Sequence, residues 1–172
     1  MGLVPADINL SGAEIELAGL AGREFLLKEA LSSLRGYDYI FIDCPPSLGL
    51  LTLNTLTAAQ EVFIPLQTEY LALYGIAKLT TTVELVRKRL NRKLEITGIL
   101  PTRFDSRKNL NREVLNKIQE HFRDKVFKTL IRDNISLAEA PSYGQTIFEY
   151  APKSYGAEDY LKLCKEIAGR SF

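Results

Sequence analysis

The sequence has few of the residues that build covalent or metal-bound frameworks. It contains two cysteines, Cys44 and Cys164, which lie far apart without paired spacing, and one histidine, His121. This set argues against a disulfide framework and against a metal site made of cysteines or histidines. A structural role is therefore the favoured interpretation of His121.

Long apolar runs and a charge of one dominant sign are lacking as well. No segment approaches the length needed to cross a membrane, and the first residues do not have the basic-then-apolar build of a signal peptide. The net charge of +1 gives no global attraction to nucleic acids or membranes, so any such contact has to come from a local patch. We therefore expect a cytoplasmic protein without a membrane partner.

The composition that remains is typical of a folded globular protein. Hydrophobic residues make up 46% of the sequence and charged residues 25%, which argues against disorder. A chain of 172 residues can form one domain with its own core. We expect a single domain over residues 1–172.

Strand-like and helix-like patterns alternate along the chain. Short apolar runs predict strands at Tyr39–Ile42, Glu61–Leu66, Leu94–Leu100 and Lys125–Ile131. Helical spacing of apolar residues predicts helices at Glu24–Leu34, Leu50–Ala59, Leu73–Leu90, Leu110–Phe122 and Ala157–Ala168. This alternation implies an α/β fold, in which right-handed crossovers build a mostly parallel sheet with helices on both faces.

The most informative stretch is residues 37–47, which read YDYIFIDCPPS. An apolar run ends there in Asp43, and Pro45 and Pro46 then prevent regular structure from continuing. The run is too short and too uniformly apolar for an amphipathic helix, so it predicts a buried strand. α/β folds bind ligands at the carboxyl ends of such strands. On this pattern alone, a turn or cap role for Asp43 is about equally well supported.

Residues 42–49, IDCPPSLG, resemble the Walker B and switch II segment of the ParA/Soj partition ATPases, which are deviant-Walker P-loop proteins. Other segments are similar to this family in the same order along the chain. They are residues 4–10, 12–17, 48–56, 62–73, 138–145 and 150–157. The resemblance covers nearly the whole chain, and it implies a P-loop NTPase-like fold.

One segment of that family has no counterpart here. ParA proteins open with a strand and a glycine-rich loop of the type GKGGVGKT, which holds the nucleotide's phosphates. No glycine before Tyr37 is followed by Lys-Ser or Lys-Thr. We therefore expect the carboxyl-terminal portion of a ParA protein, without the phosphate-loop strand, the first helix and the switch I aspartate. Its unpaired strand edge would be completed by repacking, self-association or another polypeptide.

The resemblance implies roles for three residues near the predicted Walker B strand. Asp43 would be the catalytic-site carboxylate and would hold Mg²⁺ through a water molecule, because Mg²⁺ keeps several of its waters. Pro45 and Pro46 would belong to the switch that senses the γ-phosphate of ATP. Without phosphates beside it, however, a single carboxylate binds Mg²⁺ weakly.

The resemblance also implies a binding site for the adenine of ATP. The loops after the third and fourth predicted strands would enclose the base, with Thr102 and Arg103 from one loop and Arg132 and Asn134 from the other. Without the family context, a turn or helix cap is at least as good an interpretation of Asn134.

Two clusters of basic residues could contact nucleic acid. By resemblance, Arg107 would bind DNA without sequence preference, although a second arginine of the family is Ser136 here. Lys108 belongs to the same basic cluster and is a further candidate for DNA binding, but a solvated surface residue is the favoured interpretation of it. The other cluster follows the predicted helix Leu73–Leu90 and comprises Arg87, Lys88, Arg89, Arg92 and Lys93. For that cluster, cations that stabilise a helix carboxyl end are the favoured interpretation over a nucleic-acid patch.

The resemblance implies a chromosome or plasmid partition ATPase that binds ATP and Mg²⁺, dimerises and is associated with the nucleoid. A ParB-like protein would stimulate its hydrolysis of ATP. Because the phosphate loop is missing, we do not expect this chain to hydrolyse ATP alone. The alternative is a non-catalytic interaction module derived from a ParA ATPase, which binds a ParB-like partner or another ParA chain.

Overall fold

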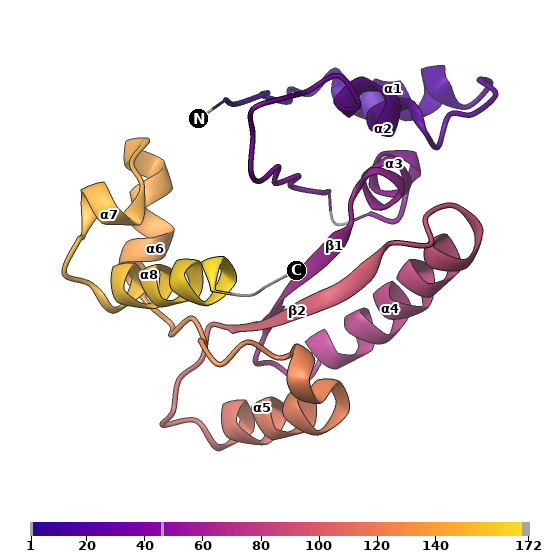
Figure 1. The fold of residues 1–172 in the computed structure, drawn as a ribbon. Helices are drawn as coiled ribbons and strands as arrows, with labels where there is room; N and C mark the ends of the chain where they lie inside the picture. Colours follow the sequence, from indigo (N-terminus) through magenta and orange to yellow (C-terminus); the bar gives the residue numbers. More distant parts are fainter. Residues whose placement is uncertain (1, 46, 170–172) are drawn as a thin grey trace. The chain divides into compact units, whose positions relative to one another are not determined.

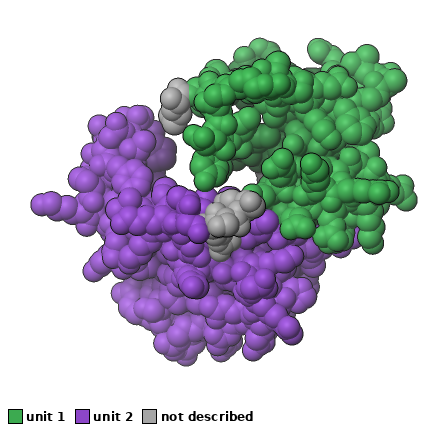
Figure 2. All heavy atoms as spheres, viewed as in Figure 1, with its two compact units in different colours: residues 1–62, 82–95 green, residues 63–81, 96–172 purple. Residues whose placement is uncertain are grey.

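The structure is a computed structural model that describes residues 2–45 and 47–169. It contains two compact units (Figure 2). Unit 1 comprises residues 1–62 and 82–95, and unit 2 comprises residues 63–81 and 96–172. The expectation of a single domain stays a prediction.

A parallel pair of strands forms the sheet of this α/β fold (Figure 1). β1 (Glu61–Gln67) and β2 (Glu95–Thr102) are joined through helix α4 (Ala72–Arg89). The two strands run parallel, because Glu95 N–H donates to Gln60 O at one end and Thr68 N–H donates to Thr102 O at the other, both over 3.0 Å. Two of the predicted strands are therefore confirmed.

Residues 126–132 run parallel to the free edge of β2 but do not form a continuous strand. Parallel bridges join Ile99 to Val126 and Phe104 to Arg132. Between them, the N–H groups of Lys128 and Thr129 donate to the two carboxylate oxygens of Glu166, each over 2.9 Å. The predicted strand Lys125–Ile131 is thus wrong as a regular strand, because a side-chain carboxylate takes part of its backbone hydrogen bonding.

The core of unit 2 lies where this segment packs against β2. Its buried cluster consists of Leu100, Phe127, Ile131 and Leu163, with Phe63, Leu137 and Ile167 packed against it. The rings of Phe63 and Phe127 meet edge to face with centroids 5.5 Å apart. Gly98 makes this possible, because a Cβ atom there would lie 2.2 Å from the Phe127 ring. A larger residue would displace the ring.

Helices α5 (Asn109–Phe122) and α8 (Tyr155–Ala168) lie on opposite sides of β2 in Figure 1, as predicted for a covered sheet. α5 buries Val114 and Ile118, and a 3₁₀ turn, η1 (Arg123–Lys125), follows it. α8 starts at the N-cap Ser154, whose hydroxyl accepts a hydrogen bond from Ala157 N–H. Amphipathic spacing therefore located both helices correctly.

Three short elements of unit 2 were not predicted from apolar spacing. They are α6 (Ile135–Glu139), the 3₁₀ turn η2 (Ala140–Tyr143) and α7 (Ile147–Tyr150). α7 begins with a capping box, in which Thr146 and Glu149 exchange side-chain and backbone hydrogen bonds. Such helices are too short to show an apolar face, so the capping residues are their only local signal.

Unit 1 contains α1 (Leu10–Leu17), which was not predicted, α2 (Leu26–Leu31) and α3 (Leu50–Ala58). Asn54 of α3 is buried and ties α3 to α2 and to the residues just before α2. Its amide donates to Arg23 O over 2.8 Å and its side-chain oxygen accepts from Leu27 N–H over 3.1 Å. α2 is shorter than the predicted helix Glu24–Leu34 and has no buried residue.

Residues 37–45 have no regular secondary structure, so the prediction of a buried strand at Tyr39–Ile42 is wrong. Tyr39, Ile40 and Phe41 are 54%, 50% and 72% exposed. A strand needs a neighbouring strand for its backbone hydrogen bonds, and no strand pairs with this run in the described part of the chain.

None of the described helices is both long enough and apolar enough to span a lipid bilayer.

Candidate functional site

The loops at the carboxyl edge of the sheet in unit 2 are tied together by buried hydrogen bonds. Thr68, which follows β1, is fully buried, and its hydroxyl donates to Thr102 O and Arg103 O, both over 3.3 Å. Its N–H also donates to Thr102 O. Thr102 therefore has a fixed backbone position at the edge where α/β sheets bind ligands.

Arg103, in the loop after β2, links the loop after β1 to the loop after residues 126–132. Its guanidinium lies 3.8 Å from the Glu69 carboxylate after β1 and 3.8 Å from the Asp133 carboxylate after residues 126–132. The residue has φ = 52°, a left-handed conformation that non-glycine residues seldom adopt. Such conformations occur preferentially at ligand sites, where the surrounding structure holds them in place.

Asn111 of α5 connects the loops after β1 and β2, and sequence reasoning missed it. Its side chain is 5% exposed, donates to Thr68 O over 2.7 Å and accepts from Asp105 N–H over 2.9 Å. No local signal separates Asn111 from the other asparagines of this helix, because its acceptor, Thr68 O, lies 43 positions away.

Arg132 is held by carboxylates of α8. Its Nε donates to Asp159, with distances of 3.1 and 2.9 Å to the two oxygens, and its Nη2 donates to Asp159 (2.6 Å) and Glu158 (2.7 Å). These bonds raise the pKa of Arg132. The guanidinium also lies 4.2 Å from the centroid of the Tyr155 ring. Its predicted role in nucleotide binding stays a prediction, with this guanidinium engaged inside the fold.

Asn134 is the N-cap of α6, as the local interpretation of the sequence expected. Its side-chain oxygen accepts a hydrogen bond from Ser136 N–H over 2.9 Å. The residue is half-buried and follows Asp133, the partner of Arg103. Its part in nucleotide binding is a prediction that this capping role does not exclude.

The residues predicted to bind DNA follow the second loop. The Arg107 side chain is 88% exposed, and its guanidinium donates two hydrogen bonds, of 3.0 and 2.9 Å, to the Asp105 carboxylate. Hydrogen bonds from the side chain and backbone of Arg107 lower the pKa of Asp105 to about 2. Lys108 is exposed at the N-cap of α5. Both cations can therefore reach an external anion, but Arg107 has an internal partner already.

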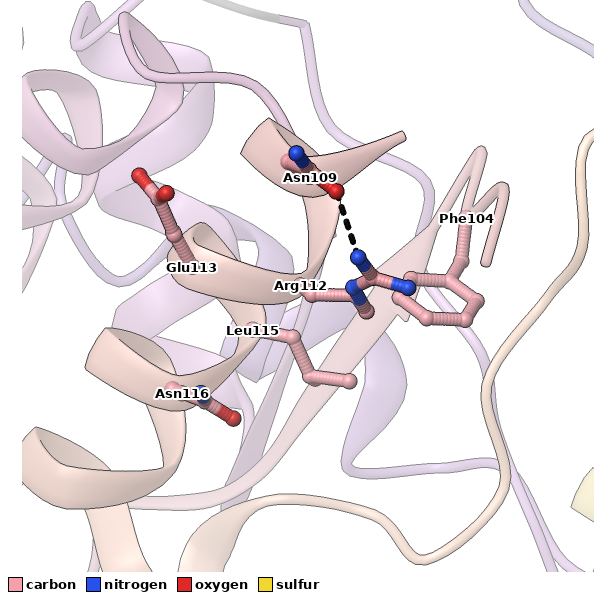
Figure 3. Close-up of a pocket in the computed structure, with 6 residues that line it drawn as sticks. All are labelled: Phe104, Asn109, Arg112, Glu113, Leu115 and Asn116. Atoms are coloured by element: carbon pink, nitrogen blue, oxygen red, sulfur yellow. Dashed lines mark hydrogen bonds between the residues drawn. The ribbon is translucent and has the colours of Figure 1, made fainter. Parts of the chain in front are cut away.

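An open pocket lies beside these residues on α5. Figure 3 shows the residues that line it, which are Phe104, Asn109, Arg112, Glu113, Leu115 and Asn116. Arg112 donates to the Asn109 side chain and to Ser106 O. The lining combines a cation that is already hydrogen-bonded with a carboxylate, so it favours no single class of charged ligand, and none of the predicted nucleotide-binding residues lines it.

Asp43 lies in unit 1, whereas Thr102, Arg103, Arg132 and Asn134 belong to unit 2. Asp43 and Pro45 are exposed in the irregular segment, and Pro46 lies outside the described residues. The segment leads to α3, whose first turn is capped by Glu14, because the carboxylate of Glu14 accepts from Leu51 N–H over 3.2 Å.

The chemistry of Asp43 fits a magnesium site only in part. Among the described residues, no group of three or more His, Cys, Asp or Glu side chains could hold a metal ion. Mg²⁺ needs only one or two carboxylates when waters and phosphate oxygens supply its other ligands. An exposed aspartate can be such a ligand, provided that the phosphates of a nucleotide lie beside it.

A family model and several curated proteins are similar to this chain. A family model described as AAA domain matches residues 1–96. The chain is 54% identical over 167 residues to the sporulation initiation inhibitor protein Soj of Bacillus subtilis, with 96% of this chain and 66% of Soj covered. It is 50% identical over 169 residues to the chromosome partitioning protein ParA of Myxococcus xanthus, with 98% of this chain and 60% of ParA covered.

A solved structure is similar over the same range. The crystal structure of cobyrinic acid a,c-diamide synthase from Mycobacterium smegmatis with bound ADP and magnesium has a TM-score of 0.78 and 38% sequence identity. The match covers 96% of this chain and 62% of that one. The chain thus spans between 60% and 66% of the length of these three proteins.

Proposed function

This chain belongs to the ParA/Soj family of partition ATPases, and we propose that it acts in the ATP-dependent partition of a chromosome or plasmid. In this proposal it binds ATP with Mg²⁺, associates with a second ParA-type chain, and binds DNA without sequence preference. A ParB-like partner stimulates the hydrolysis. The similarity to proteins named for chromosome partitioning supports this function over the amide synthesis for which the M. smegmatis protein is named.

The nucleotide site is proposed from the hydrogen bonds and ion pairs that hold the loops at the carboxyl ends of the strands of unit 2 together. Thr68 and Asn111 hold the backbone of residues 102–105 in place, and Arg103 reaches from there to Glu69 and Asp133. Preformed loops of this kind lose little conformational entropy when they close around a ligand. We assign them to the adenine base, with Thr102, Arg103 and the backbone around Asn134 in contact with it.

We assign Asp43, a residue of unit 1, to the Mg²⁺ that accompanies the ATP. When bound, Mg²⁺ would neutralise charge on the phosphates, and Asp43 would hold it through a water molecule. Pro45 and Pro46, which follow Asp43 and Cys44 in the sequence, would belong to the switch that senses the γ-phosphate of ATP. Because these 172 residues contain no glycine-rich loop with Lys-Thr, the phosphate-binding backbone has to come from outside them.

Calorimetry of ATP binding in the presence of Mg²⁺ tests the proposal, with Asp43→Ala as the test variant. Asp38→Ala is the matched control, because Asp38 is an exposed carboxylate of the same segment. We expect the wild type to bind ATP when a polypeptide with a ParA-type glycine-rich loop is added. Asp43→Ala should weaken this binding at least tenfold, whereas Asp38→Ala should leave it unchanged.

Absence of ATP binding with and without the added polypeptide would contradict the nucleotide site. The alternative of a non-catalytic interaction module would then account for the family relationship. Equal binding by the wild type and Asp43→Ala would leave a nucleotide site but would remove Asp43 from it.

A further inference from the structure

The segment that carries Asp43 leads into α3, and the start of this helix is held by a carboxylate from α1. Gly49 is the N-cap of α3 and has no side chain that could accept hydrogen bonds from the first turn. The first backbone N–H groups of a helix have no partner inside it. Glu14 supplies one from 37 positions away, because its Oε1 accepts a hydrogen bond from Leu51 N–H over 3.2 Å.

Gly49 leaves the room that this contact needs. A Cβ atom at position 49 would overlap both carboxylate oxygens of Glu14. The backbone of Gly49 has φ = −91°, which any residue can adopt, so glycine is required here for space alone. Glu14 is half-buried, and its negative charge lies at the positive end of the α3 dipole.

Side-chain packing constrains the start of α3 only loosely. A hollow of about 380 Å³ lies beside Glu14 and Gly49, and Leu48, Leu50 and Leu53 are among the apolar residues that line it. Protein interiors are normally filled to crystal-like density, so a backbone next to an open hollow is less constrained by its neighbours. The hydrogen bond from Leu51 to Glu14 is therefore important for the position of this helix start.

The position of the helix start limits where Asp43 can lie. Thr52 is buried, and its hydroxyl donates to Ser47 O over 2.6 Å, which fixes Ser47 to the first turn of α3. Asp43 is four residues before Ser47 in the sequence, and four extended residues span at most about 14 Å. A shift of the helix start therefore changes the region that the Asp43 carboxylate can reach.

We propose that Glu14 is a positioning residue, which holds the start of α3 and thereby the segment from which Asp43 reaches Mg²⁺. Glu14 itself contacts neither the nucleotide nor the metal. The effect on Mg²⁺ rests on the proposed function, whereas the effect on the start of α3 does not.

Hydrogen exchange measured by NMR tests the effect on α3 in the full chain without nucleotide. Glu14→Ala should speed the exchange of Leu51 N–H by about three- to tenfold, as expected for the loss of one helix cap. Glu14→Gln keeps an oxygen acceptor but loses the charge, so its effect should be smaller. Glu16→Ala is the matched control, because Glu16 is an exposed glutamate of the same helix, and it should leave the exchange rate unchanged.

Gly49→Ala disrupts the same contact from its other side. Its Cβ atom displaces the Glu14 carboxylate, so the exchange of Leu51 N–H should speed up as in Glu14→Ala. A double variant should exchange no faster than the faster single variant, because both changes remove one contact. The N–H of Phe127, which donates to Ile99 O in unit 2, reports whether each variant is folded. If Glu14→Ala is not folded, Glu14→Gln and Gly49→Ala decide the test.

Calorimetry of ATP binding separates a positioning role from a purely structural one. The full chain is mixed with the polypeptide that carries the glycine-rich loop, and binding is measured with Mg²⁺ and with EDTA. Glu14→Ala should weaken binding about three- to tenfold with Mg²⁺ and leave it unchanged in EDTA. A purely structural role would weaken both equally.

Equal exchange rates of Leu51 N–H in Glu14→Ala and Glu16→Ala would overturn the inference. So would an equal loss of ATP affinity with Mg²⁺ and with EDTA. A wild-type chain that binds no ATP would contradict the proposed function, and the exchange rates would then decide whether Glu14 positions the start of α3.

Discussion

Residues 39–42 and residues 126–132 are both short runs with apolar residues, but their surroundings differ. Phe41 is 72% exposed, whereas Phe127 is 3% exposed between Phe63 and the flat surface at Gly98. The second run has β2 on one edge and side-chain carboxylates of α8 on the other. The first has no strand beside it among the described residues. Burial therefore follows from satisfied backbone edges as much as from apolar side chains.

The carboxylates of α8 take the place of a further strand. Glu166 accepts the N–H groups of Lys128 and Thr129, and Asp159 accepts that of Arg132. An edge with free N–H groups invites pairing with other chains, and covering it with acceptors prevents this. Residues 39–42 have no such cover among residues 2–45 and 47–169, and they are where we expect another polypeptide to contact this chain.

The largest expected effect comes from truncating one phenylalanine in each region. Phe127→Ala should lower the free energy of unfolding by about 3 to 5 kcal/mol, because it leaves a cavity in the core of unit 2. Phe41→Ala should change it by less than about 0.5 kcal/mol, because the ring is exposed. Urea unfolding of both variants measures the difference. Equal losses would mean that residues 39–42 are buried in solution, by a second chain or otherwise.

A somewhat smaller effect is expected from the carboxylates that cover residues 126–132. Asp159→Ala should lower the free energy of unfolding by about 3 kcal/mol, because it leaves the Arg132 guanidinium and N–H without their buried acceptor. Glu158→Ala is the control, since its half-exposed carboxylate binds the same guanidinium but contributes little. Chemical denaturation compares the two, and a loss for Glu158→Ala as large as that for Asp159→Ala would contradict the edge-covering role.

The smallest expected effect concerns the loop after β2. The pKa of Asp105 is lowered from 3.8 to about 2 by hydrogen bonds from Arg107. A lowered pKa in the folded state means that this carboxylate stabilises the fold above pH 3.8 and loses that effect as the pH falls through about 2. Arg107→Gln should raise the pKa of Asp105 towards its ordinary value.

Carboxyl carbon NMR titration measures this pKa in the wild type and in Arg107→Gln. Lys128→Gln is the control, because it removes a cation of unit 2 that has no part in the bonds to Asp105. An unchanged pKa in Arg107→Gln would show that the ion pair does not persist in solution. Arg107 would then be free to bind DNA without competition from Asp105.

Much of the fold could be predicted because it depends on local patterns. Apolar runs located β1 and β2, and helical spacing located α3, α4, α5 and α8 to within a few residues. Asn134 was recognisable as a helix cap for the same reason, since its partner Ser136 lies two positions away. The residues that hold the candidate site together were not recognisable. Asn111 bonds Thr68 across 43 positions, and Asp159 bonds Arg132 across 27.

The sequence by itself determined β1, β2 and the longer helices, the family, and the carboxylate and loops that we propose for a nucleotide. These depend on residues that are neighbours in the chain. Tertiary structure alone decided which apolar runs are buried, and that the Arg132 guanidinium binds α8. The physical reason is that backbone edges and charged side chains bind whichever partner folding brings close. That partner is distant in the sequence, so neighbouring residues do not identify it.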